Sequence, residues 1–239
     1  MSVFNDEIKE SFILHVPHSS TRIPDFSSYT NVGLVQSQID LLTDWGTDKI
    51  FKVDGVDSVV CDWSRVFCDV ERLVDDPLES SGYGIFYTHT DDGVCFRDES
   101  YKNKIVEDYY NRYHARLTEL TRSKEKEHGV CYIVDCHSYP NEPFIRENAT
   151  EKYRPDVCIG TNENTPKFML DMFVNFFVLE GYDVGINQPF SGAIIPQGCS
   201  DTYSIMIEFN RNLYMLDNRV CDDKIEVLNR SINDLFELL

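Results

Sequence analysis

The chain has 239 residues, and its 41 acidic side chains outnumber its 22 basic ones, which gives a formal net charge of −19 with histidine neutral. A charge this negative repels phosphate backbones and anionic lipid headgroups, which argues against nucleic acid or a membrane surface as the main partner. With 42% hydrophobic residues the chain can bury a core. Because no repeat or linker divides it, we expect a single domain over residues 1–239.

Neither the start of the chain nor its cysteine pattern predicts export. The first ten residues carry three acidic side chains and no basic patch before an apolar stretch, so we expect no signal peptide. The most apolar segment, 168–179, is interrupted by Asp171 and Asn175 and is too short to span a bilayer. The eight cysteines are scattered without a Cys-x-x-Cys pair, which predicts free thiols in a cytoplasmic protein.

Compact apolar runs alternate with amphipathic segments along the chain. Runs typical of strands occupy residues 12–16, 59–61, 130–134, 157–159 and 203–207. Helical periodicity occupies about 20 residues around 105–120, and also residues 166–180 and 225–239. Residues 166–180 are apolar nearly all the way round the helix, which predicts deep burial or a subunit contact.

The order of these segments predicts an α/β domain. Strands that are apolar throughout and separated by helices favour a mixed, mostly parallel sheet with helices on both faces. In such a sheet the ligand crevice lies at the carboxyl ends of the strands. The polar residues near the end of each strand are therefore the first candidates for a functional site.

Three such residues suggest a metal site. His18 follows the first strand, His137 follows the strand at 130–134, and Glu208 follows the strand at 203–207. Zinc binds nitrogen and oxygen donors, and a catalytic zinc usually has three protein ligands and a water. A single histidine is more often a polar group satisfied in the core, but two in equivalent positions favour a metal site.

Five short motifs resemble the N-formylglutamate amidohydrolase family. In chain order they are Pro17-His18-Ser19-Ser20, the stretch 64–72, Asp135-Cys136-His137-Ser138, Pro189-Phe190-Ser191-Gly192 and Ile207-Glu208-Phe209-Asn210-Arg211. The resemblance implies a fold similar to zinc carboxypeptidases and aspartoacylase-type deacylases, of the phosphorylase/hydrolase-like kind. It also implies a metal-dependent hydrolase that cleaves an N-formyl or short N-acyl amino acid, with one Zn²⁺ per chain or another divalent metal in its place.

The same resemblance assigns roles to individual residues. His18 and His137 would bind the metal, and Glu208 would act as the catalytic base. We prefer Asp44 as the third ligand, and Glu71 is its main rival. The alternative for Asp44 is that it only stabilises the amino end of the next helix.

Two positions depart from the relatives' patterns. Zinc carboxypeptidases have a glutamate three residues after the first histidine, where this chain has Thr21. The family pattern Asp-Leu-Asn-Arg becomes Asp-Val-Glu-Arg here, so Glu71 replaces an asparagine that holds substrate. A glutamate beside Arg72 would repel an anionic substrate or neutralise the arginine, which puts N-formylglutamate itself in question.

On the substrate side, Arg72 keeps a guanidinium that can grip a carboxylate through two hydrogen bonds. Arg65 and Arg211 are further candidates for this work, although each could equally be a surface ion pair. Ser191 and Gly192 occupy the other side of the predicted site. The expected partner is thus a small N-acyl amino acid, with no nucleic acid or membrane, and an oligomer is possible.

Other functions fit the sequence less well. A cysteine hydrolase using Cys136 and His137 is disfavoured, because adjacent residues of an extended chain point to opposite faces. A structural zinc site would require four ligands, preferably paired cysteines, and these are absent from the sequence. A catalytically inactive member of the fold that binds a small molecule or a protein remains the alternative, and Thr21 and Glu71 favour it.

Overall fold

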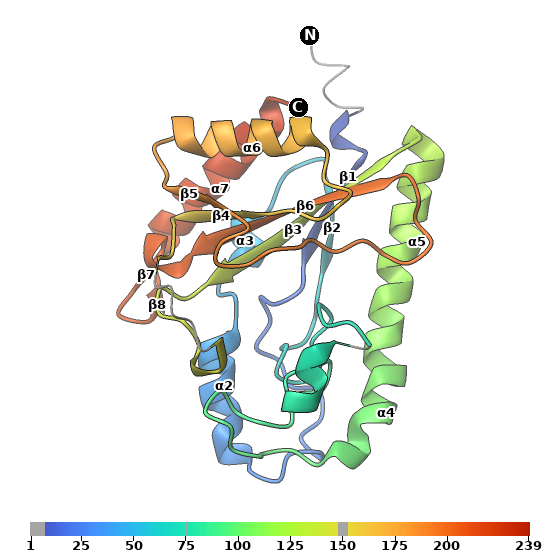
Figure 1. Cartoon of the computed structure of the whole chain (residues 1–239), viewed down its shortest axis with the longest axis vertical. Coiled ribbons are helices and arrows are strands. Elements are labelled where there is room, and N and C mark those ends of the chain that lie inside the picture. Colours follow the sequence, from blue (N-terminus) through green and yellow to red (C-terminus); the bar gives the residue numbers. More distant parts are fainter. Residues whose placement is uncertain (1–7, 75, 148–152) are drawn as a thin grey trace.

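The structure, a computed structural model, describes residues 8–74, 76–147 and 153–239, and a six-stranded sheet forms its centre (Figure 1). The strands are β1 (Phe12–Val16), β2 (Asp57–Val60), β3 (Cys131–Tyr139), β4 (Val157–Gly160), β5 (Val184–Ile186) and β6 (Thr202–Asn210). They lie in the order β2-β1-β3-β6-β4-β5, and every pair is parallel except β4 with β6. The predicted mixed, mostly parallel α/β sheet is confirmed.

Helices connect these strands, and a small hairpin of β7 (Met215–Leu216) and β8 (Arg219–Val220) stands apart from the sheet. The helices are α2 (Val35–Leu42), α3 (Thr47–Ile50), α4 (Lys102–Ile105), α5 (Asn111–His128), α6 (Lys167–Leu179) and α7 (Asp222–Glu237). A π-helical turn over 106–110 joins α4 to α5, so that together they form the long helix at the side of Figure 1. The three helices predicted from periodicity are present, with ends shifted by a few residues.

Helices cover both faces of the sheet. Along β1, Leu14 points to the face where α3, α6 and α7 pack, and Ile13 points to the face covered by α5. The same alternation holds in β3 for Val134 and Ile133. Successive side chains of a strand point to opposite faces, so a strand covered on both sides is apolar throughout. This explains why the strands read as continuous apolar runs in the sequence.

Two strands are longer than the sequence suggested. β3 continues to Tyr139 and β6 to Asn210, so His137 and Glu208 lie inside strands and not after them. The two residues are direct neighbours in the parallel register of β3 and β6. The extension was missed because polar side chains alternate here with buried apolar ones, and a run defined by continuous apolarity stops at the first polar residue.

The segments 20–42, 61–74 and 76–101 lie together below the sheet, in the lower half of Figure 1. Arg97 links them. Its guanidinium is buried, donates to Ser28 Oγ and to the carbonyls of Val66 and Phe67, and stacks on the ring of Phe86 at 3.6 Å from the centroid. These contacts fix the loops that carry the polar residues described below.

Among the described residues, no helix is both long enough and apolar enough to cross a membrane. All eight cysteines are free thiols, as predicted. Residues 1–7, on which part of the signal-peptide expectation rests, lie outside the described part of the chain.

The packing of α6 leads to a stability prediction. Phe177 is fully buried, and its ring lies edge-on to that of Phe209 with centroids 5.7 Å apart. Phe177→Ala leaves a cavity, so we expect the free energy of unfolding to fall by about 3–5 kcal/mol. Leu179→Ala, on the same helix but 86% exposed, should change it by less than about 0.5 kcal/mol. Urea denaturation followed by circular dichroism measures both, and equal effects would contradict the placement of α6.

Candidate active site

A cavity of about 290 Å³ lies where β1, β3 and β6 present their carboxyl ends. Most of the residues singled out in the sequence line it: His18, Asp44, Arg65, Glu71, Arg72, His137, Ser191 and Glu208. They come from both halves of the chain. The crevice therefore lies where a mostly parallel sheet predicts it.

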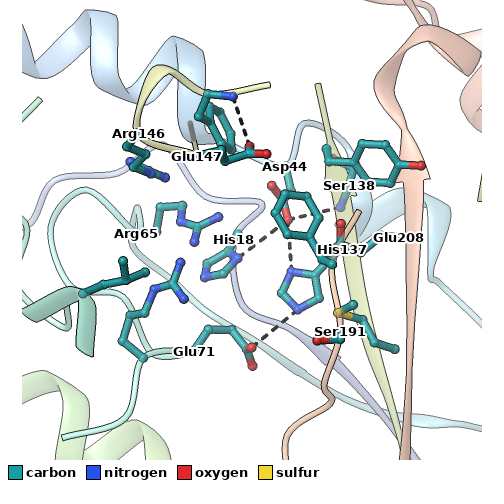
Figure 2. A pocket seen from close by; sticks show the side chains of 16 residues that line it. His18, Asp44, Arg65, Glu71, His137, Ser138, Arg146, Glu147, Ser191 and Glu208 are labelled. Atoms are coloured by element: carbon teal, nitrogen blue, oxygen red, sulfur yellow. Dashed lines mark hydrogen bonds and ion pairs between the residues drawn. The ribbon is translucent and has the colours of Figure 1, made fainter. Parts of the chain in front are cut away.

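Asp44 lies between the two histidines (Figure 2). Its Oδ2 is 3.2 Å from Nδ1 of His137 and 3.7 Å from Nδ1 of His18. All three residues are buried, and their potential ligand atoms lie within 4.8 Å of one another. In the described part of the chain, His18 Nδ1 has no hydrogen-bond partner. A buried nitrogen without a partner is costly unless something else binds it.

The donor set fits a zinc ion. Tetrahedral zinc with ligand bonds of about 2.0–2.1 Å places its ligand atoms about 3.3 Å apart, close to the separations found here. The outer nitrogen of each ring is held by a carboxylate: His18 Nε2 lies 2.8 Å from Asp69 Oδ1, and His137 Nε2 lies 3.0 Å from Asp135 Oδ1. Metal-binding histidines are usually oriented in this way.

Asp44 is fixed by contacts from distant parts of the chain. Its amide donates to the carbonyl of His18, and its carboxylate accepts from the amide of Ser138 and from Nη2 of Arg211 at 3.0 Å. Burial opposes its ionisation, but the neighbouring His137 and His18 hold the pKa of Asp44 well below its usual value. Its carboxylate is not a cap for α3, whose N-cap residue is Gly46.

Asp69 organises the other side of the cavity. Besides His18, its carboxylate accepts from Tyr87 Oη at 2.5 Å, from the amide of Glu71, and from two nitrogens of Arg65 at 2.9 and 3.2 Å. Despite its burial, the neighbouring Arg65 and His18 hold the pKa of Asp69 well below its usual value. The Arg65 fork is thus already occupied by Asp69.

Glu208 is a buried carboxyl on the wall of the same cavity. Burial raises its pKa to about 8, although nearby His137 opposes the shift. Among the described residues, its Oε2 has no hydrogen-bond partner. Because Glu208 lines the cavity, its carboxyl group can exchange a proton with a molecule bound there.

Two arginines offer guanidinium nitrogens that lack hydrogen bonds to the described residues, Nε of Arg72 and Nη1 of Arg146. Arg72 Nε is 3.7 Å from Asp69. Arg146 lies across the cavity from Glu71 in Figure 2, with its guanidinium over the rings of Phe144 and Tyr83. Both arginines line the cavity, so their guanidinium groups can bind an anionic group there.

Comparison with known proteins places the chain in a family. The sequence profile of N-formylglutamate amidohydrolase matches residues 10–215. The chain belongs to the N-formylglutamate amidohydrolase family. Family membership makes it an amidohydrolase, which acts on a small molecule. Among curated proteins, none matches the chain significantly.

Two crystal structures share the fold of this family member. The N-formylglutamate amidohydrolase from Ralstonia eutropha is 21% identical, with a TM-score of 0.83 over 95% of this chain and 91% of that one. A gene product from Agrobacterium tumefaciens is 14% identical, with a TM-score of 0.70 over 98% of this chain and 92% of that one. At these identities the likeness concerns the fold.

Two residues predicted to bind substrate lie outside the cavity wall of this amidohydrolase. Arg211 does not line the cavity: its three nitrogens donate to Ser138 Oγ, the Leu41 carbonyl and Asp44, so it supports Asp44. Gly192 donates its amide to the carbonyl of Thr161 and does not line the cavity, whereas Ser191 does.

Sequence reasoning missed four residues: His15, Asp69, Asp135 and Arg146. His15 and Asp135 could have been noticed, because a histidine or an aspartate inside an apolar strand is buried only when it has specific partners. Asp69 lies within the family motif at residues 64–72, but the motif alone did not indicate its role. Arg146 lies in a segment without periodicity, so only the folded chain shows that it faces the cavity.

The support that Arg211 gives to Asp44 can be tested in the chelator-treated protein. Arg211→Met leaves the buried Asp44 carboxylate without its cationic partner, so the free energy of unfolding should fall by about 3–5 kcal/mol. Arg219→Met, at an exposed position of β8, should change it by less than about 0.5 kcal/mol. Urea denaturation measures both. An Arg211 variant as stable as the Arg219 variant would show that the ion pair is dispensable.

Proposed function

We propose that the chain is a zinc-dependent amidohydrolase that cleaves an N-formyl or short N-acyl amino acid, with N-formylglutamate as the model substrate. The observation that carries this proposal is one cavity in which Glu208, with a free oxygen, faces the cluster of His18, Asp44 and His137. The relative from Ralstonia eutropha bears the name of this activity. We expect one zinc to be held by the three clustered residues.

The residues of the cavity would have different roles in amide hydrolysis. Bound zinc would polarise the substrate carbonyl and lower the pKa of a water toward 7. Glu208 would take a proton from the attacking water on its carboxylate and deliver it to the nitrogen of the broken amide. The products are a carboxylate and a free amine. Asp69 and Asp135 keep the rings of His18 and His137 in place during the reaction.

Arg72 and Arg146 would hold the acidic groups of the substrate. A guanidinium and a carboxylate form strong, directional hydrogen bonds, and both arginines have a donor to offer in the cavity. The net charge of −19 repels an anion at long range, so binding must depend on these local contacts. Their main effect is to orient the amide toward Glu208.

The first test combines metal content with turnover on N-formylglutamate. Glu208→Gln removes the proton acceptor but no metal ligand, so the variant should keep its zinc while kcat falls by roughly 10²–10⁴-fold. His18→Ala and His137→Ala should each lose the zinc held by this cluster, and with it the activity. Glu226→Gln, at an exposed position, is the matched control and should change neither.

These outcomes separate the enzyme from the alternative, a binding protein without turnover. A wild-type chain that binds zinc and substrate but releases no amine from any N-acyl amino acid would overturn the proposed activity. Normal turnover in Glu208→Gln would leave the activity standing and remove Glu208 as its base.

The second test concerns the substrate anchors. Arg72→Ala and Arg146→Ala each remove a charged hydrogen-bond donor, worth about 1.5–3 kcal/mol, so kcat/KM should fall by roughly 10- to 150-fold. The loss should be smaller for substrates that lack the matching carboxylate. Arg116→Ala, at an exposed position of α5, serves as the control. Unchanged steady-state kinetics in both cavity variants would contradict the anchor role.

A further inference from the structure

A second cluster of polar side chains lies on the other side of His137. It consists of His15 in β1, Asp135 in β3 and Glu71 from the loop after β2, and their ligand atoms lie within 4.8 Å of one another. His15 and Asp135 are neighbours in the parallel register of the two strands, and both side chains are fully buried. His15 Nδ1 is 2.7 Å from Asp135 Oδ1 and 3.5 Å from Glu71 Oε1.

Among the described residues, the ion-pair partners of the two carboxylates in this cluster are histidines. Asp135 Oδ1 is approached by His15 and His137, and its Oδ2 accepts from the amide of Ile194. Within the described residues, neither Asp135 nor Glu71 has a lysine or arginine within ion-pair distance, and Glu71 Oε1 has no hydrogen bond. The single proton on His15 Nδ1 cannot serve both carboxylates at once.

A divalent cation satisfies these groups better than a proton does. One imidazole nitrogen and two carboxylate oxygens form a ligand set that zinc and similar transition metals bind. A proton on Glu71 would neutralise one charge and still leave Asp135 to be shared by two histidines. A metal ion would bind both carboxylates and the lone pair of His15 Nδ1 together.

We propose that His15, Glu71 and Asp135 form a second divalent-metal site, so that the chain holds two metal ions. His137 separates the two sites: its Nδ1 faces Asp44, while its Nε2 faces Glu71 at 3.8 Å (Figure 2). The same Nε2 lies 3.0 Å from Asp135 Oδ1. This goes beyond the proposed function, because the second site uses a different ligand set and does not require the first to be catalytic.

The test counts zinc per chain. Tag-free protein is stripped with chelator, checked for native circular dichroism, equilibrated with excess zinc, freed of unbound ion by gel filtration, and analysed for metal and protein. We expect two zinc ions in the wild type and one in Glu71→Gln. His15→Asn should also hold one, and Glu71→Gln keeps the test valid if His15→Asn does not fold. Glu99→Gln, at an exposed position, is the control and should retain two.

Removing the first site completes the test. His18→Ala should hold one zinc, and His18→Ala combined with Glu71→Gln should hold none. A wild-type chain with a single zinc that His18→Ala removes and Glu71→Gln keeps would overturn the second site while leaving the proposed hydrolase intact. The reverse pattern, with a single zinc lost only in Glu71→Gln, would support the second site and overturn the metal ligands of the proposed hydrolase.

Discussion

The candidate active site depends on the buried carboxylate of Asp44. It contacts His18 after β1, His137 in β3 and Arg211 after β6, so one side chain joins three strands at their carboxyl ends. A carboxylate removed from water needs such partners, since an unpaired buried charge would destabilise the fold. The contacts that position the Asp44 carboxylate between the histidines therefore also compensate the cost of burying it. A substitution that changes the geometry of this site should also change the stability of the fold.

The fold could be predicted because a strand buried on both faces is recognisable in the sequence as a continuous apolar run. Strands covered by α5 on one side and by α6 and α7 on the other are continuous apolar runs, and the helices between them keep a 3.6-residue period. The apolar pattern is interrupted where β3 and β6 line the cavity. There β3 and β6 carry polar side chains on the cavity side, and β5, with three residues, is too short to form a pattern.

The site was predictable in part, and the limits have a physical cause. His18, His137 and Glu208 could be located because strand ends carry function in this architecture. What each guanidinium binds depends on contacts between residues far apart in sequence, as for Arg211 and Asp44, which are 167 residues apart. The periodicity of apolar residues indicates which positions are buried, but not which side chains contact one another. Hence the sequence could not show that Arg211 donates to the carboxylate of Asp44.

The charge of Glu71 links the second metal site to the binding of an anionic substrate. In an amidohydrolase expected to bind an anion, a carboxylate at this position works against Arg72, and the acidic surface of the chain adds to the repulsion. A divalent metal ion bound to Glu71 and Asp135 would neutralise this local negative charge. The replacement of asparagine by glutamate would then add a ligand without abolishing anion binding, and the substrate carboxylate would still meet a net positive environment near Arg72 and Arg146.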